Sequence, residues 1–466
     1  MPIYSVKPEV LKEIEAEYFD KKCAKSKKMV DEAKMYIPGG VQHNLAFNHP
    51  FPLAIEKAEG AYLYDVDGNR YYDFLQAGGP IVLGSNPEPV RNKVIELLSN
   101  GGPSTGLFHE YEYKLAKKIS DCVPSVDMFR MMGSGNEAVM GATRIARLAT
   151  KNKRIVKMGG AYHGWNDQLA YSIRIPGSRW TQANGVPKKF MSLTDEFFPN
   201  DLADLERVLK ANTKKGGTAA VFLEAIGPES GTRPVDYHFP KGVQDLCRKY
   251  GALFVIDEVV TGFRIGMSGA QGYYGLDPDL TIFGKVITGG YPGAGGIGGK
   301  AEYMQYLGAG VGGSTKVKKA LVGGTMAAAP ISCVAGYYTL CEIEKTGAIE
   351  KAGKMADRLV AGLNTLIDKY ELPFVAFNQG SVAHLDTTGC MQYYIDWSKP
   401  WQIPNVLSQT SARKKEMEHI GAAYTAEGII TLAGNRIYTS AAYDEAMIDD
   451  VLTRFDRVFA NCEQLK

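Results

Sequence analysis

The sequence predicts an α/β protein with a large, mostly parallel sheet domain and a smaller α+β domain. Three observations support this prediction. From about residue 90 to 300, short apolar runs alternate with helical runs, as in parallel strands joined by crossover helices. After about residue 331, long helical runs and short strands follow instead. The chain's 466 residues are also too many for one compact core.

The N-terminal region predicts a helix and a hairpin. Residues 9–34 favour a charged helix that ends at Pro38-Gly39-Gly40. Residues 61–74 favour a β-hairpin with Asp67-Gly68-Asn69 at its turn, because residue types alternate along both arms. Both termini are expected to build the small domain, which gives three segments: residues 1–85 (helix and hairpin, part of the small domain), residues 86–330 (large domain) and residues 331–466 (the rest of the small domain).

The predicted large domain contains five candidate strands with helices between them. The strands are Asp127–Met131, Arg154–Met158, Ala219–Leu223, Leu253–Ile256 and Leu280–Phe283. The helical runs include Glu137–Ala149 and Pro240–Tyr250, and the C-terminal region adds Ile331–Glu344 and Ala348–Lys369. Because ligands bind at the carboxyl ends of the strands in such sheets, residues that follow the strands are the candidate site residues.

Composition and charge argue against several classes of protein. Lysine plus arginine number 53 and aspartate plus glutamate 51, and the resulting net charge of +2 favours neither nucleic acid nor an anionic membrane. No run approaches the roughly 20 apolar residues of a spanning helix, and the N-terminus lacks the features of a secretory signal. The seven cysteines are scattered without a Cys-x-x-Cys pair, so we expect a cytoplasmic protein without disulfides or a metal site.

Lys285 and Asp257 are the most informative candidates. Lys285 follows the apolar run Leu280–Phe283, and Asp257 follows Leu253–Ile256. A lysine and a carboxylate at strand ends suit pyridoxal 5′-phosphate, whose aldehyde forms a Schiff base with a lysine and whose ring nitrogen stays protonated opposite a buried carboxylate. Taken singly, Lys285 would be a solvated strand end and Asp257 a helix cap.

A second group of candidates follows the first two strands. Ser134, Gly135 and Asn136 open a helix whose N-terminal amides and dipole suit a phosphate, although an ordinary serine cap explains Ser134 equally well. Tyr162 is a candidate to stack on a flat ring, with a core tyrosine as the alternative. His163 either helps to position the ring or is a hydrogen-bonded structural histidine.

Two further candidates lie on the third and fourth strands. Glu224 ends the third strand, where it is expected to hydrogen-bond the cofactor's surroundings or to order a neighbouring loop. Val259 lies two residues after Asp257 and therefore on roughly the same side. It is a candidate to pack on the second face of the cofactor ring.

Together these motifs resemble those of the class III aminotransferases of fold type I, most closely the branch similar to glutamate-1-semialdehyde aminomutase. The resemblance runs from about Ile37 to the C-terminus and rests on these segments: Ser134-Gly135-Asn136-Glu137-Ala138, Tyr162-His163-Gly164, Asp257-Glu258-Val259 with Gly262-Phe263, and Phe283-Gly284-Lys285 with Gly289-Gly290. It implies a seven-stranded type of sheet and pyridoxal phosphate as cofactor. Gly324-Thr325 is similar to the pair with which one subunit caps its neighbour's phosphate, which implies a homodimer with shared active sites.

The resemblance also implies a role for each matching residue. Lys285 is similar to the Schiff-base lysine, which also moves the proton between Cα of the substrate and C4′ of the cofactor. Asp257 is similar to the acid that pairs with the pyridine nitrogen. Gly135 and Asn136 are similar to the phosphate cradle, and Tyr162 to the stacking aromatic residue.

The N-terminal loop departs from the family's pattern. Aminomutases and β-amino-acid transaminases of this branch carry a carboxylate-binding arginine there, whereas residues 41–47 contain none. His43 is the candidate substrate residue in this segment, although histidine is a poor replacement for a bidentate arginine. Arg436 is a candidate for the carboxylate of an oxo-acid acceptor, with a surface arginine as the alternative. Gly78-Gly79, where aminomutases have a bulky aromatic residue, predicts a wider pocket.

Three hypotheses of function follow. The first is a transaminase that moves an amino group to a 2-oxo acid from an amine or a β-aminoacyl donor, 3-aminobutyryl-CoA being the narrowest suggestion. The second is an aminomutase acting on an amino-aldehyde such as glutamate-1-semialdehyde, against which the missing arginine argues. The third is a nucleotide-binding oxidoreductase or a non-catalytic binding protein, which the absence of a Gly-x-Gly-x-x-Gly motif after the first strand opposes.

Overall fold

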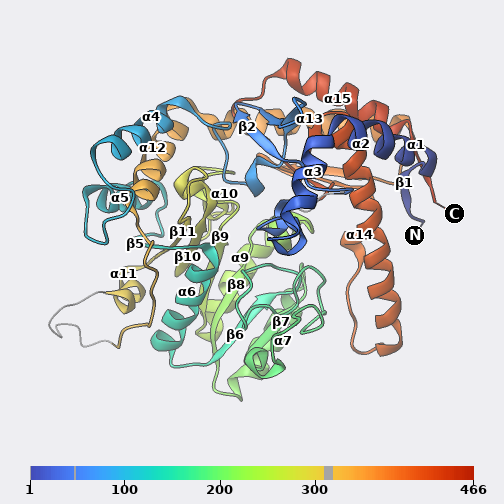
Figure 1. The fold of residues 1–466 in the computed structure, drawn as a ribbon. Helices are drawn as coiled ribbons and strands as arrows, with labels where there is room; N and C mark the ends of the chain where they lie inside the picture. The colour runs from blue at the N-terminus through green and yellow to red at the C-terminus, as the bar shows by residue number, and fades with distance from the viewer. Residues whose placement is uncertain (1, 47–48, 309–317, 466) are drawn as a thin grey trace. The chain divides into compact units, whose positions relative to one another are not determined.

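The computed structural model describes residues 2–46, 49–308 and 318–465, which form two compact units (Figure 1). The first, here called the terminal unit, contains Met1–Glu88, Gly347–Tyr393 and Ile403–Lys466. The second, here called the sheet unit, contains Pro89–Thr346 and Tyr394–Gln402. Within the described ranges, no helix has both the length and the apolar character needed to cross a membrane.

The sheet unit is built on a seven-stranded sheet, which agrees with the predicted fold class. Its strand order is β5-β11-β10-β9-β8-β6-β7, and all neighbours are parallel except β11, which runs antiparallel to both of its neighbours. The strands are β5 Met128–Met132, β6 Arg154–Met158, β7 Thr194–Phe197, β8 Thr218–Leu223, β9 Leu253–Glu258, β10 Leu280–Gly284 and β11 Gly295–Gly299. The five predicted strands are confirmed within two residues at each end.

Strands β7 and β11 complete the sheet and were not predicted. β7 reads Thr-Asp-Glu-Phe and β11 reads Gly-Gly-Ile-Gly-Gly, so neither has the apolar run of a buried strand. Glycine in β11 permits a close approach of the backbone, because a Cβ atom on Gly295 would lie 2.2 Å from the carbonyl oxygen of Ser134. This strand therefore brings the start of the following helix against the sheet.

Helices connect and cover the strands of the sheet unit. α6 packs on the central strands through an apolar cluster that includes Ala138, Ala142, Ile145 and, from the sheet, Ile282. The helices are α4 Glu88–Asn100, α5 Glu110–Cys122, α6 Gly135–Thr150, α7 Leu202–Thr213, α8 Pro228–Gly231, α9 Phe239–Tyr250, α10 Gly269–Tyr273, α11 Ala301–Met304 and α12 Pro330–Thr346. α12 packs on α5 and therefore groups with the sheet unit, whereas the prediction assigned residues from 331 onward to the small domain.

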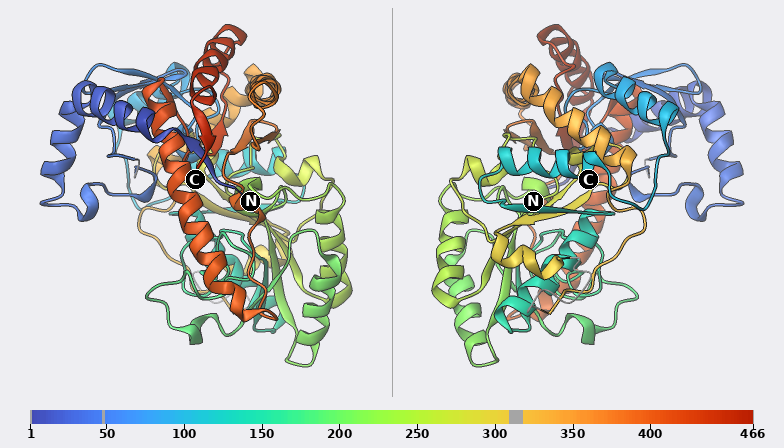
Figure 2. Two further views of the ribbon diagram at one scale, coloured as in Figure 1. Left: turned by 90° about the vertical axis from the view of Figure 1, so that its right-hand side faces the viewer. Right: turned by 90° about the vertical axis from the view of Figure 1, so that its left-hand side faces the viewer.

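The terminal unit is assembled from both ends of the chain. Its first strand pairs with its last, so the two termini lie close together (Figure 1, Figure 2). The predicted hairpin is confirmed as β3 and β4, and the predicted N-terminal helix is α1 to α3 with a π-helical turn, Ile14–Phe19, inside it. The strands are β1 Tyr4–Val6, β2 Ile55–Glu59, β3 Tyr62–Asp65, β4 Arg70–Asp73, β12 Val375–Gln379, β13 Val382–Asp386, β14 Ile429–Ile430, β15 Arg436–Tyr438 and β16 Cys462–Gln464.

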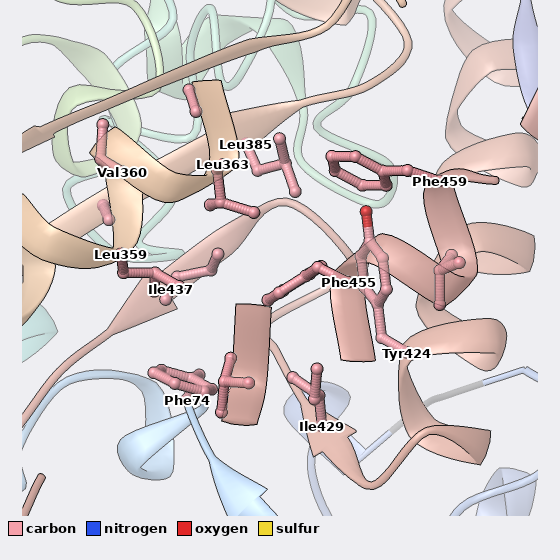
Figure 3. Packing of buried hydrophobic residues seen from close by; sticks show 14 of the residues in the cluster. Phe74, Leu359, Val360, Leu363, Leu385, Tyr424, Ile429, Ile437, Phe455 and Phe459 are labelled. Carbon is pink, nitrogen blue, oxygen red and sulfur yellow. The ribbon is translucent and has the colours of Figure 1, made fainter. Parts of the chain in front are cut away.

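One apolar core holds the terminal unit together. The helices are α1 Pro8–Glu13, α2 Asp20–Lys22, α3 Ala24–Ala33, α13 Ala348–Lys369, α14 Ile403–Ala426 and α15 Glu445–Phe459. Figure 3 shows Phe74, which follows β4, packed with Leu363 of α13, Tyr424 of α14 and Phe455 of α15. Because these residues are fully buried and distant in sequence, the N-terminal hairpin depends on C-terminal helices for its core.

Candidate active site

The ends of two neighbouring strands bring Lys285 and Asp257 to the same edge of the sheet. β9 and β10 are parallel, and Asp257 is the register partner of Ile282. Lys285 follows β10 directly, three residues beyond that partner. An amine and a carboxylate therefore leave the sheet from adjacent strands at their carboxyl ends, where ligands bind in sheets of this kind.

The backbone of Lys285 is held in an uncommon conformation. Its φ angle is 47°, in the left-handed region that residues with a side chain rarely adopt. The residue begins a short 3-10 turn, Lys285–Thr288, and its side chain is half-buried. Strained residues of this kind cluster at functional sites, where the surrounding structure holds them. The uncommon backbone thus coincides with the one residue that the sequence singled out as the Schiff-base candidate.

Asp257 is a buried carboxylate with two hydrogen-bond donors. His163 Nδ1 lies 2.7 Å from Asp257 Oδ2, and the N–H of Val259 donates to Oδ1 at 3.0 Å. Burial lowers the pKa of His163, so the imidazole is neutral near pH 7 and its Nδ1 donates the proton to the carboxylate. Both donors to the Asp257 carboxylate are therefore uncharged groups.

Glu224 organises the two loops beside this pair. Its carboxylate accepts hydrogen bonds from the backbone N–H groups of Tyr162 at 2.8 Å, Glu229 at 3.0 Å and Ser230 at 2.7 Å. Glu229 and Ser230 have left-handed φ angles of 53° and 60°, so the carboxylate holds a strained turn. Burial, with a smaller contribution from the Asp257 charge, raises the pKa of Glu224 to about 7. These contacts favour the loop-ordering interpretation of Glu224.

The N-terminus of α6 combines a serine cap with amides that the cap leaves unused. The Ser134 hydroxyl accepts from the N–H of Glu137 at 3.3 Å, and the Glu137 carboxylate accepts from the N–H of Gly133 at 2.9 Å. Ser134 is therefore a helix cap, the alternative raised from the sequence. The cap does not use the N–H groups of Gly135 and Asn136, which remain at the positive end of the helix dipole.

The Asn136 side chain has a task that the sequence did not predict. Its Oδ1 accepts from both the backbone N–H and the side-chain Nδ2 of Asn166, each at 3.1 Å. Gly164 is required here, because a Cβ atom at that position would lie 2.2 Å from Asn136 Oδ1. Asn136 thus ties the loop after β6 to the start of α6, and no motif marked Asn166 as its partner.

Val259 lies between the two chain segments that flank it. A Cβ atom on Gly135 would lie 2.8 Å from one Val259 methyl group, and one on Gly284 would lie 2.9 Å from the other. The two glycines therefore allow α6, β9 and β10 to approach one another around this side chain.

Tyr162 is held through its backbone by Glu224. The residue is 46% exposed, which leaves its ring accessible for stacking.

The remaining predicted residues belong to other segments of the chain. Thr325 is exposed in the single chain, and Gly324 beside it lies next to the Glu137 carboxylate. His43, which is exposed, and Arg436, on β15 opposite His384, belong to the terminal unit. Phe47, the last residue of the arginine-free segment, falls outside the described residues. Among the residues that are described, no group of His, Cys, Asp or Glu side chains is arranged to hold a metal ion.

Comparison with known families decides what this arrangement belongs to. The family model described as aminotransferase class-III matches residues 45–387, which is most of the chain. The chain belongs to this family. It is therefore an enzyme, a class III aminotransferase that uses pyridoxal 5′-phosphate, and the oxidoreductase and binding-protein hypotheses are set aside.

Solved structures share the fold of this aminotransferase. An ω-transaminase from Sphaerobacter thermophilus is 24% identical with a TM-score of 0.83, over 95% of this chain and 99% of its own. A β-phenylalanine aminotransferase from Variovorax paradoxus is 23% identical with a TM-score of 0.80, over 96% of each chain. A glutamate-1-semialdehyde aminomutase from Pseudomonas aeruginosa PAO1, in complex with PMP, is 19% identical with a TM-score of 0.83, over 99% of this chain and 100% of its own.

The residues of the sheet unit fit the cofactor of this aminotransferase family. Pyridoxal phosphate offers an aldehyde, a basic ring nitrogen, a flat ring and a phosphate. The sheet unit offers a lysine amine, a buried carboxylate hydrogen-bonded to His163, an exposed aromatic residue and a helix N-terminus with amides that its cap leaves unused. When bound, the cofactor withdraws electrons from an amino donor and so loosens the proton on the donor's Cα.

The pKa of Glu224 leads to a test of stability against pH. The native chain holds a proton on Glu224 up to about pH 7, whereas the ordinary pKa is 4.5. The raised pKa means that protonated Glu224 favours the folded state. This contribution to the free energy of unfolding, about 3 kcal/mol at most, is fully present below pH 4.5 and is lost as the pH rises through about 7. The Glu224→Gln variant has no such proton. In urea unfolding of the cofactor-free protein, wild type should therefore lose stability relative to this variant between pH 5 and pH 8.

The matched control is Glu302→Gln, which changes an exposed carboxylate of the same unit. Its stability difference from wild type should stay flat over the same pH range. A flat difference for Glu224→Gln as well would contradict the raised pKa.

Proposed function

We propose that this enzyme is a transaminase that transfers the amino group of a β-aminoacyl compound, including CoA thioesters such as 3-aminobutyryl-CoA, or of an amine, to a 2-oxo acid. The observation that carries the proposal is the position of Lys285 and Asp257 on adjacent strand ends, with Asp257 accepting a hydrogen bond from His163. The absence of arginine from residues 41–47 directs the choice of donor.

Each residue of the sheet unit has a distinct task in this proposal. The amine of Lys285 would hold the cofactor through its aldehyde and would move the proton that the cofactor loosens on the donor's Cα. The Asp257 carboxylate would pair with the ring nitrogen and favour its protonated form. The N–H groups of Gly135 and Asn136 bind the phosphate, and Tyr162 and Val259 pack on the two ring faces.

The donor is inferred from the absence of arginine in residues 41–47. A bidentate arginine is the usual partner of a substrate carboxylate, and residues 41–47 provide only His43. A donor without a free carboxylate at that point, such as a thioester or an amine, does not require one. Gly78 and Gly79 have φ angles of 84° and 117°, at which a bulky side chain would be strained, and this supports a wide pocket. Arg436 is proposed for the carboxylate of the oxo acid.

A homodimer with shared sites forms part of the proposal. Residues 103–109 and 321–331 of the sheet unit lie together, joined by a hydrogen bond between His109 Nε2 and the carbonyl oxygen of Ala328 at 2.9 Å. They expose four large apolar side chains, between 55% and 82% of each: Leu107, Phe108, Leu321 and Met326. Such a patch is typical of a protein interface. Thr325 lies within it, as expected of a residue that caps the neighbour's phosphate.

Replacing Lys285 tests the reaction. The Lys285→Ala variant should lose the absorbance of the Schiff base and all turnover, because no other amine can supply both the covalent link and the proton transfer. The Lys153→Ala variant, which removes an exposed lysine from the same unit, should keep both. Absorbance spectra and borohydride reduction followed by mass spectrometry measure the link. Full activity of Lys285→Ala would end the proposal.

A half-reaction assay separates the transaminase from the aminomutase and identifies the donor. Amines, β-amino acids and β-aminoacyl-CoA thioesters are each mixed with the enzyme without oxo acid. The proposed donors should convert the cofactor to its amine form and then stop until a 2-oxo acid is added. Repeated turnover of glutamate-1-semialdehyde without an oxo acid would instead identify an aminomutase.

The dimer is tested by charging the apolar patch. Leu321→Asp and Phe108→Asp should each convert a dimer into monomers in sedimentation analysis and lower activity, because a buried unpaired carboxylate opposes association. Phe190→Asp, at an exposed phenylalanine elsewhere in the sheet unit, should change neither. Wild type that sediments as a monomer at full activity would contradict the shared site.

A further inference from the structure

Lys157 is a fully buried lysine on β6 that the reaction does not use. Its side chain is 0% exposed. The ammonium group donates to three backbone carbonyl oxygens, those of Ala161 at 2.6 Å, Tyr171 at 2.7 Å and Leu169 at 3.5 Å. A lysine has three N–H donors, so this set uses all of them on one loop, residues 159–171. Burying an ammonium group is costly, which argues for a task that an apolar residue would not perform.

The loop that Lys157 holds carries two of the candidate cofactor residues. Ala161 directly precedes Tyr162 and His163, and Leu169 and Tyr171 lie on the returning arm of the loop. The Nζ atom of Lys157 therefore binds the backbone at both the start and the end of this loop. Two other hydrogen bonds hold the same loop. The N–H of Tyr162 donates to Glu224, and the N–H of Asn166 donates to Asn136.

The charges around Lys157 connect it with the carboxylate at the ring nitrogen. No carboxylate of the described residues forms an ion pair with it, and burial lowers its pKa to about 8. Four carboxylates act on it at longer range and oppose this lowering: Glu196, Glu224, Glu229 and Asp257. The Lys157 charge also helps to lower the pKa of His163, which favours the neutral imidazole that donates to Asp257.

Glu196 shows that this region is packed around polar groups. Its carboxylate accepts from the N–H of Gly177 at 2.8 Å. It also occupies the place that a side chain on Gly159 would take, 2.9 Å from where that Cβ atom would lie. Glu196 is nevertheless not a direct partner of Lys157, so the carbonyl groups of the loop are the direct ligands of the ammonium group.

We propose that Lys157 is a positioning residue of the cofactor site, which holds residues 159–171 so that Tyr162 meets the cofactor ring and His163 donates to Asp257. It acts through the loop and touches neither cofactor nor substrate. The proposal rests on the assignment of Tyr162 and His163 to the cofactor made above. A lysine that served only the stability of the fold would leave the cofactor's environment unchanged.

The test compares Lys157→Met and Lys157→Gln with wild type as holoenzymes. Methionine keeps the chain length without a donor, and glutamine keeps a shorter, uncharged donor. We expect the dissociation constant of pyridoxal phosphate to rise, and kcat to fall, about 10–100-fold, because small misplacements of site groups have effects of this size. The KM for the donor should change much less. The pH titration of the bound cofactor's absorbance should also shift, because His163 and Asp257 lose their arrangement.

A lower melting temperature alone, with wild-type cofactor affinity and an unchanged absorbance titration in either variant, would overturn the proposal. If the methionine variant does not fold, the glutamine variant carries the same readouts. The Glu196→Gln variant changes a neighbouring charge without touching the three carbonyl ties, so its cofactor affinity should stay near that of wild type. Cofactor affinity and absorbance are measured without any donor, so they remain informative even if the proposed donors are wrong.

Discussion

The hydrogen bond from His163 to Asp257 is the interaction on which the cofactor site depends. A carboxylate that is only 6% exposed is costly unless donors replace the water it has lost. His163 and the N–H of Val259 supply these donors, at 2.7 Å and 3.0 Å. Since burial keeps the imidazole neutral, the donor satisfies the carboxylate without cancelling its charge. In the proposed function, this carboxylate pairs with the ring nitrogen of the cofactor.

This arrangement requires the loop after β6 to stay in one place, and buried polar groups on neighbouring elements hold it there. Glu224, which follows β8, binds the loop's backbone at Tyr162, Asn136 on α6 binds it at Asn166, and Lys157 on β6 binds both of its arms. Apolar packing alone would tolerate small shifts of such a loop, whereas each of these contacts fixes a particular backbone atom. Polar side chains near the sheet therefore position this loop as much as the apolar core does.

The sequence predicted the parts of the fold that follow from apolar periodicity. Arg154–Met158 and Leu253–Ile256 are apolar enough to be recognised as buried strands, and residues after such strands must meet at one edge. β11 was not predicted because its Gly-Gly-Ile-Gly-Gly sequence has no apolar run or β-branched pattern. Its glycines instead leave room for the backbone of Ser134. β7 was not predicted because two of its four residues are acidic.

The site was predictable where a residue's chemistry is rare and unpredictable where only its contacts matter. Lys285 and Asp257 carried a signal because an amine and an acid at adjacent strand ends suit one particular cofactor. Lys157 carried none, since a single lysine in an apolar strand is commonly taken as a solvated end. Asn166 is an ordinary loop residue until its bond to Asn136 is seen.

The residues proposed to choose the substrate are separate in sequence from those that hold the cofactor. His43, the Gly78-Gly79 pair and Arg436 all belong to the terminal unit, whereas the candidate cofactor residues belong to the sheet unit. The hydrogen bonds described here for Asp257 and for the backbone of Tyr162 all join residues of the sheet unit. The absence of an arginine from residues 41–47 therefore removes none of these hydrogen bonds. On this proposal, the residues that select the donor and those that hold the cofactor belong to different units of the chain.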